Sequence, residues 1–117
     1  ELTQSQLSIT KAPTKPVHFY CEVKNIDINE AIIHWYRQRP GEGLQWLLYF
    51  KSHSDMQKDA AAERFVAGKI PEKKSCSLLL TNIRADDAGT YYCAYWKVAT
   101  SGTWIKIFGS GTRLIVT

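Results

Sequence analysis

Alternation of apolar side chains with other residues, in short stretches broken by turn residues, limits how this chain can fold more than any other feature. Val17, Phe19, Cys21 and Val23 occupy every second position of residues 17–23. Successive side chains of a β-strand point to opposite faces, so a period of two predicts a strand with one buried face. Cys21 is therefore predicted to lie in the core.

The rest of the chain shows the same organisation. Ile33 and Trp35 continue the inward pattern, and residues 44–50, after a turn at 40–43, are apolar on both faces and need cover on both sides. Alternation returns at residues 76–80, and residues 107–116 are interrupted only by a glycine-containing bulge signal. Helical periodicity is limited to a turn near residues 83–87. Many short strands separated by turns predict an all-β sandwich of two sheets.

Length and composition point to one ordinary globular domain. The chain has 117 residues, of which 44% are hydrophobic and 22% charged, and its apolar runs are far too short for a membrane span. We expect a soluble fragment, and a mature piece cut from a leader or anchor would look the same. The net charge of +4 is spread along the chain among acids, which argues against a nucleic-acid surface.

The cysteines and histidines argue against metal binding and catalysis. Three cysteines without a CxxC motif or a nearby histidine pair predict one disulfide and one leftover thiol, not a zinc site. A disulfide indicates an oxidising, extracellular setting. His18, His34 and His53 have no cysteine or carboxylate at ligand spacing, and no nucleophile, base and orienting residue converge. We therefore expect no enzyme activity, no metal and no cofactor.

Several motifs together resemble an antigen-receptor variable domain. Cys21, Trp35 and Cys93 follow the order of the immunoglobulin sandwich, and Tyr91 stands where its tyrosine corner belongs. Residues 87–93 resemble the family's DxGxYYC, and residues 35–41 resemble its WYRQxPG stretch. Residues 108–112 resemble the FGxGT bulge of a joining segment, followed by a final strand at 113–117.

Softer features make the gamma chain of a T-cell receptor the most similar family. These features are the residues after the second cysteine (94–96), the residues before FGxG (104–107) and the stretch 70–72. An alpha chain or a light chain shares some of them. The resemblance divides the single domain, residues 1–117, into a V segment at about 1–97 and a joining segment at about 101–117.

The resemblance implies the internal architecture. It implies an immunoglobulin V-type, two-sheet Greek-key sandwich with an inter-sheet Cys21–Cys93 disulfide. By the same resemblance Trp35 and Tyr91 are core residues, and Gln4 caps backbone groups beside the second cysteine. Arg64 and Asp87 resemble the framework ion pair that closes the bottom of the sandwich; a solvated pair is the alternative.

Cys76 departs from the family, which usually carries a polar or larger residue there. The alternation of residues 76–80 points this side chain inward. We expect a buried free thiol that behaves as a small hydrophobe, and a reactive or intermolecular thiol is the alternative.

One set of side chains is predicted to form a face that packs against a second variable domain. Exposed together, they would leave a large apolar patch on a lone domain, and such patches mark interaction surfaces. In the family these positions form the pairing face, with glutamines meeting across a pseudo-twofold axis. Core filling is the alternative, mostly for Trp46. The residues are Tyr36, Gln38, Leu44, Trp46, Tyr92 and Phe108.

Three loops at one end of the sandwich are the predicted ligand-binding surface, by resemblance residues 24–31, 50–55 and 95–104. The third loop combines aromatic residues with small ones, as binding loops tend to do. For Tyr95 and Trp96 the alternative is a loop base packed against the partner chain. The predicted ligand-contacting residues are Asn25, Asp27, Asn29, Lys51, His53, Asp55, Tyr95, Trp96, Lys97, Val98, Thr100 and Trp104.

The resemblance implies a binding function. A T-cell receptor gamma variable domain pairs with a delta-chain variable domain, and the pair presents its loops to a protein or protein-presented antigen. The parent protein is then the extracellular part of a plasma-membrane receptor. An alpha chain or immunoglobulin light chain would share the loops but change the partner. A V-type adhesion or inhibitory surface domain is the alternative of another class, and it would lack a spliced FGxGT strand.

Overall fold

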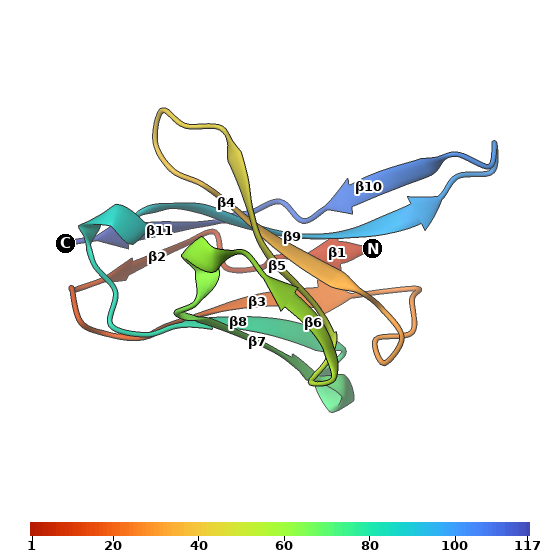
Figure 1. Ribbon diagram of the computed structural model, residues 1–117, viewed down its shortest axis with the longest axis horizontal. Helices are drawn as coiled ribbons and strands as arrows, with labels where there is room; N and C mark the ends of the chain where they lie inside the picture. The colour runs from red at the N-terminus through yellow and green to blue at the C-terminus, as the bar shows by residue number, and fades with distance from the viewer.

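The computed structural model describes residues 1–117 as two β-sheets packed face to face (Figure 1). The smaller sheet has the order β1 (Leu2–Thr3), β3 (Val17–Val23), β8 (Ser75–Leu80), β7 (Phe65–Ile70). The larger sheet has the order β2 (Ser8–Lys11), β11 (Thr112–Val116), β9 (Gly89–Val98), β4 (Ile33–Gln38), β5 (Leu44–Ser52), β6 (Asp55–Lys58), with β10 (Trp104–Phe108) paired to β9. The predicted all-β, two-sheet sandwich is confirmed.

Only short 3₁₀ turns interrupt the strands. Of η1 (Ala60–Ala62), η2 (Pro71–Lys73) and η3 (Ala85–Asp87), the last lies where the sequence predicted a helical turn. All strand pairs are antiparallel except β2 with β11. No helix has the length and apolar character needed to cross a membrane.

Sequence alternation translates directly into burial. In β3 every second residue from Val17 to Val23 is buried and those between are exposed. In β5 a register shift against β4 lets Leu47 and Leu48 both be buried, which explains why this stretch is apolar on both faces. The inner faces of the two sheets therefore form one apolar core.

A disulfide joins the two sheets at the centre of this core. Cys21 of β3 and Cys93 of β9 are bonded, as predicted, with their Cα atoms 6.4 Å apart. Trp35 lies opposite Cys93 in the β4–β9 register and is almost fully buried. The disulfide closes a loop of 72 residues, for which the chain-entropy treatment gives a stabilisation of about 4 kcal/mol.

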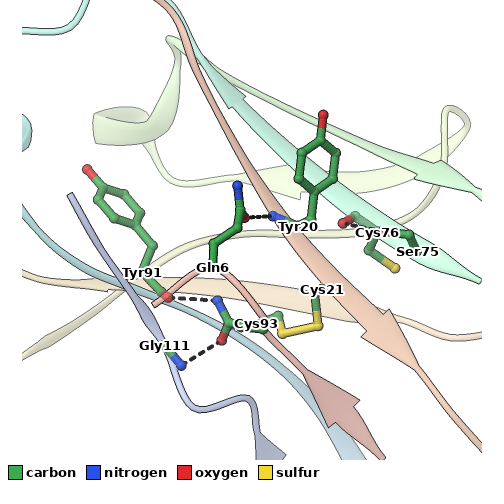
Figure 2. The surroundings of a disulfide bond; sticks show 9 residues. Gln6, Tyr20, Cys21, Ser75, Cys76, Tyr91, Cys93 and Gly111 are labelled. Atoms are coloured by element: carbon green, nitrogen blue, oxygen red, sulfur yellow. Dashed lines mark hydrogen bonds between the residues drawn. A yellow bond between two sulfur atoms is a disulfide. The ribbon is translucent and has the colours of Figure 1, made fainter. Parts of the chain in front are cut away.

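Cys76 is buried beside this disulfide and its thiol is free, as the alternation predicted. It lies directly opposite Cys21 in the β3–β8 pair, and Figure 2 shows it on the neighbouring strand. Burial raises the pKa of the thiol to about 11. The side chain therefore stays a neutral thiol at physiological pH and packs as a small apolar group.

Gln4 ties three segments together next to the disulfide. Its Nε2 donates to the Tyr91 carbonyl at 2.9 Å, and its Oε1 accepts from the backbone N–H of Cys93 at 3.2 Å and of Gly111 at 3.0 Å. Figure 2 labels Tyr91, Cys93 and Gly111, the three residues whose backbone groups bond Gln4. Buried polar side chains require such partners, so Gln4 fixes the segment between β10 and β11 against β9.

A second polar cluster forms around the buried carboxylate of Asp87 in η3. Arg64 Nη2 lies 2.7 Å and Arg37 Nη1 3.6 Å from Asp87 Oδ1. The Tyr91 hydroxyl donates to the Asp87 carbonyl at 2.7 Å, and its burial is the main reason that the pKa of this phenol is raised to about 12. The sequence analysis missed Arg37, although it shares the inward phase of Trp35. Its guanidinium also donates to Gln45 Oε1, so the buried charge is compensated on two sides.

Gly109 provides a test of the packing around Gln4. An added Cβ at Gly109 would lie 2.4 Å from Gln4 Oε1 and 2.9 Å from Cys93 Sγ. We expect Gly109→Ala to lower the free energy of unfolding by about 1–3 kcal/mol, the usual cost of overpacking a core. Denaturant unfolding monitored by tryptophan fluorescence measures this difference.

Gly43 is the matched control, because an added Cβ there meets no atom within 4 Å. We expect Gly43→Ala to change stability by about 0.5 kcal/mol or less. Equal effects of the two substitutions would contradict the packing described around Gln4.

Candidate functional site

The side chains predicted for the pairing face come together on the outer face of the larger sheet. Tyr36 is opposite Trp46 in the β4–β5 register and opposite Tyr92 in the β4–β9 register. Phe108 on β10 packs against them, its ring centroid 5.5 Å from that of Tyr36 and 6.4 Å from that of Tyr92. The two inner sheet faces already form the core, so this outer face is apolar surface that the chain does not cover.

Exposure differs between the members of this face. Phe108 is 41% exposed and Leu44 47% exposed, whereas Tyr36 is only 9% exposed because its neighbours cover it. Gln38, Leu44, Tyr92 and Phe108 line a shallow hollow of about 320 Å³. Gln38 Nε2 donates to the Glu42 carbonyl of the β4–β5 turn. A partner surface would therefore meet Leu44 and Phe108 first.

His34 forms a polar contact at the edge of this face that was not predicted from the sequence. Trp46 Nε1 donates to His34 Nδ1 at 3.1 Å. Burial, and secondarily the positive charge of Lys106, lowers the pKa of His34 to about 4. The imidazole is therefore neutral at physiological pH, with Nδ1 as acceptor and its proton on Nε2.

The predicted binding loops lie together at one end of the sandwich. Figure 1 shows the β3–β4 connection, the β5–β6 turn and the β9–β10 hairpin at the end opposite the C-terminus, with the hairpin projecting furthest. Strands extend into the predicted second and third loops. In the second loop β5 continues to Ser52 and β6 begins at Asp55, and in the third β9 continues to Val98 and β10 begins at Trp104.

Most of the predicted ligand-contacting residues are accessible at this end. Lys51 and Asp55 are half-buried, with Lys51 Nζ 3.5 Å from Glu30 Oε1 and Asp55 accepting from the Tyr49 hydroxyl at 2.9 Å. Trp96 and Trp104 are 47% and 65% exposed, and they border a hollow of about 750 Å³ between the first and third loops. The other exposed members are Asn25, Asp27, Asn29, His53, Lys97, Val98 and Thr100.

Tyr95 is the exception among the predicted contacts. It is 7% exposed, and its hydroxyl donates to Glu1 Oε1 at 2.6 Å. Burial and this bond raise the pKa of the phenol to about 12, while the same bond and the charge of Lys97 lower the pKa of Glu1. Tyr95 shares the inward phase of Tyr91 and Cys93, so it anchors the N-terminus to the hairpin base and presents little surface to a ligand.

Comparison with known proteins assigns this architecture to a family. The sequence matches the family model of the immunoglobulin V-set domain over residues 4–117. The chain belongs to the immunoglobulin V-set family. Domains of this family are not enzymes, which confirms that part of the sequence prediction.

Curated V-set relatives are similar over almost the whole chain. A T-cell receptor gamma chain V region of Mus musculus is 32% identical over 99% of this chain and 86% of its own length. A second mouse T-cell receptor gamma chain V region is 30% identical over 99% of this chain and 84% of its own length. An IgW heavy chain V region of Heterodontus francisci is 33% identical over 99% of this chain and 94% of its own length. The predicted likeness to gamma chain V regions is confirmed.

His34 predicts how the stability of this V-set domain depends on pH. The unfolded chain binds a proton at His34 near pH 6.5, whereas the folded domain does so only near pH 4. The free energy of unfolding therefore falls as the pH drops from 6.5 towards 4. We expect His34→Asn, which keeps an acceptor for Trp46, to lose this part of the pH dependence in chemical denaturation series.

His18→Gln is the control, because His18 is exposed on the smaller sheet. It should leave the pH dependence of the wild-type domain in place. Parallel stability curves for the wild-type and His34→Asn domains between pH 6.5 and 4 would contradict the account of His34.

Proposed function

We propose that this chain is the antigen-recognition variable domain of a T-cell receptor gamma chain. In this proposal it pairs with a delta-chain variable domain through the outer face of the larger sheet. The pair then binds a protein or protein-presented antigen with the loops at one end. The parent protein is the extracellular part of a plasma-membrane receptor, and the V and joining segments meet near residues 97–101.

The observation that carries the proposal is the uncovered apolar face with Leu44 and Phe108 at its surface. Exposed apolar patches of this kind mark interaction surfaces in soluble domains. The face lies on β4, β5, β9 and β10, and each of these four strands has one end at the loop end. A partner docked here would therefore bring its own loops beside those of this chain.

The aromatic residues of the third loop support a binding role for the loop end. Trp96 and Trp104 expose large rigid surfaces on either strand of the β9–β10 hairpin. Such side chains supply contact area at low conformational-entropy cost, which makes them effective anchors for a ligand. The adjacent hollow offers space for a protruding group of that ligand.

The likeness to gamma chain V regions supports the choice of partner. An immunoglobulin V domain is the second candidate, because the Heterodontus francisci IgW heavy chain V region shows a similar identity over a similar span. The two candidates differ in the domain that should pair. Co-expression with delta-chain, beta-chain, immunoglobulin heavy-chain and immunoglobulin light-chain variable domains separates them by which stable one-to-one complex appears in light scattering.

Substitutions at the accessible centre of the face test the pairing. We expect Phe108→Asp and Leu44→Asp each to weaken binding of a delta-chain variable domain by about 30-fold or more, because each places a charge in a desolvated apolar contact. Both side chains are exposed, so the unfolding temperature should stay close to that of the wild-type domain. Titration calorimetry measures the affinities.

Val66→Asp is the matched control, since Val66 is 54% exposed on β7 of the opposite sheet. The Val66→Asp domain should bind the delta-chain variable domain with the affinity of the wild-type domain. If Val66→Asp abolished pairing while Phe108→Asp still bound normally, the interface would lie on the smaller sheet and the proposal would be refuted.

A further inference from the structure

Lys106 introduces a positive charge into the otherwise uncharged pairing face. It lies on β10, opposite Trp96 in the β9–β10 register and two residues before Phe108. Its Nζ is 4.6 Å from the ring centroid of Tyr36 and 4.5 Å from that of Trp96, and it donates a hydrogen bond to Tyr36 Oη. The ammonium is therefore held by two aromatic rings and one phenol.

No carboxylate of the chain pairs with Lys106. The ion pairs of the domain are Arg37–Asp87, Arg39–Glu42, Lys51–Glu30, Arg64–Asp87 and Lys97–Glu1. Glu42, at the β4–β5 turn, is already occupied by Arg39, and Asp55, beyond Tyr49, accepts from the Tyr49 hydroxyl. An ammonium has three N–H donors, and the chain supplies one acceptor, so water serves the others in the free domain.

Covering this face would remove that water. A desolvated ammonium with a single phenol acceptor is strongly unfavourable, whereas a carboxylate in contact offsets much of the desolvation cost. A partner whose face is apolar throughout would leave Lys106 buried and without a counter-charge. The chemistry of the face therefore selects a partner that carries a carboxylate at this position.

We propose that the second V-type domain supplies an Asp or Glu carboxylate to Lys106, and that Lys106 keeps this chain from pairing with a second copy of itself. The inference rests on the pairing face of the proposed function and adds the charge of the partner to it. A second copy would bring another Lys106, and none of the side chains of its pairing face is a carboxylate. Burying the two faces together would desolvate two ammonium groups without a counter-ion, so self-pairing is weak.

Affinity for a delta-chain variable domain tests the first half of the inference. We expect Lys106→Met to weaken the complex by about tenfold or more, because the carboxylate opposite loses its counter-charge, and Lys106→Glu to weaken it further. Lys106→Arg, which keeps the charge, should bind within a few-fold of wild type. Exchanging the opposing Asp or Glu of the delta domain for Lys should restore the affinity of Lys106→Glu.

Lys73→Met controls for the change of net charge, because Lys73 is exposed in η2 at the edge of the smaller sheet. It should bind like the wild-type domain. If Lys106→Met and Lys106→Glu also bind like wild type, the inference is overturned while pairing itself stands. If the wild-type chain binds no variable domain in the panel, the proposed function fails as well.

Self-association gives a second readout that needs no partner. Sedimentation equilibrium of the isolated domain should show that Lys106→Met raises the self-association constant about tenfold or more. Adding Phe108→Asp to that variant should abolish the gain, which locates the contact on this face. An unchanged constant for Lys106→Met would show that Lys106 does not restrain self-pairing and would overturn the second half of the inference.

Discussion

The Cys21–Cys93 disulfide and the hydrogen bonds of Gln4 beside it hold the framework of this domain together, and the other features build on them. The disulfide joins β3 to β9, and Trp35 fills the core opposite Cys93. Gln4 bonds the backbone of β9 and that of the β10–β11 bend. Because the inner faces are locked together in this way, the outer face of the larger sheet can carry apolar residues without collapsing inward. The placement of Phe108 is a direct product of this framework.

The core and the proposed pairing surface thus use different faces of the same sheet. The inner face of β4 contributes Ile33, Trp35 and Arg37 to the core, and its outer face contributes Tyr36 and Gln38 to the proposed pairing surface. The outer face contributes little to the stability of the isolated domain. Its side chains can therefore be chosen for the partner that they contact. The single cation of this face, Lys106, would favour a partner with an acidic side chain opposite it and disfavour one with a basic side chain there.

Much of this arrangement could be predicted from the sequence, because strand periodicity and family motifs report inward and outward positions directly. Periodicity also carried information that the sequence analysis did not use: Arg37 and Tyr95 share the inward phase of Trp35 and Cys93, and both are buried. The contact of Lys106 with Tyr36 could not be predicted in this way. It joins residues 70 positions apart and depends on the register of β10 against β9.

The central claim is that the outer face of the larger sheet is the surface covered by a second V-type domain. Hydroxyl-radical footprinting, read out by mass spectrometry on the domain alone and in complex with a delta-chain variable domain, tests it most directly. Leu44, Tyr92 and Phe108 should lose reactivity on binding, while Tyr20 and Val66, on the smaller sheet, should keep theirs. Protection of Tyr20 and Val66, with Leu44 and Phe108 as reactive as before, would contradict it.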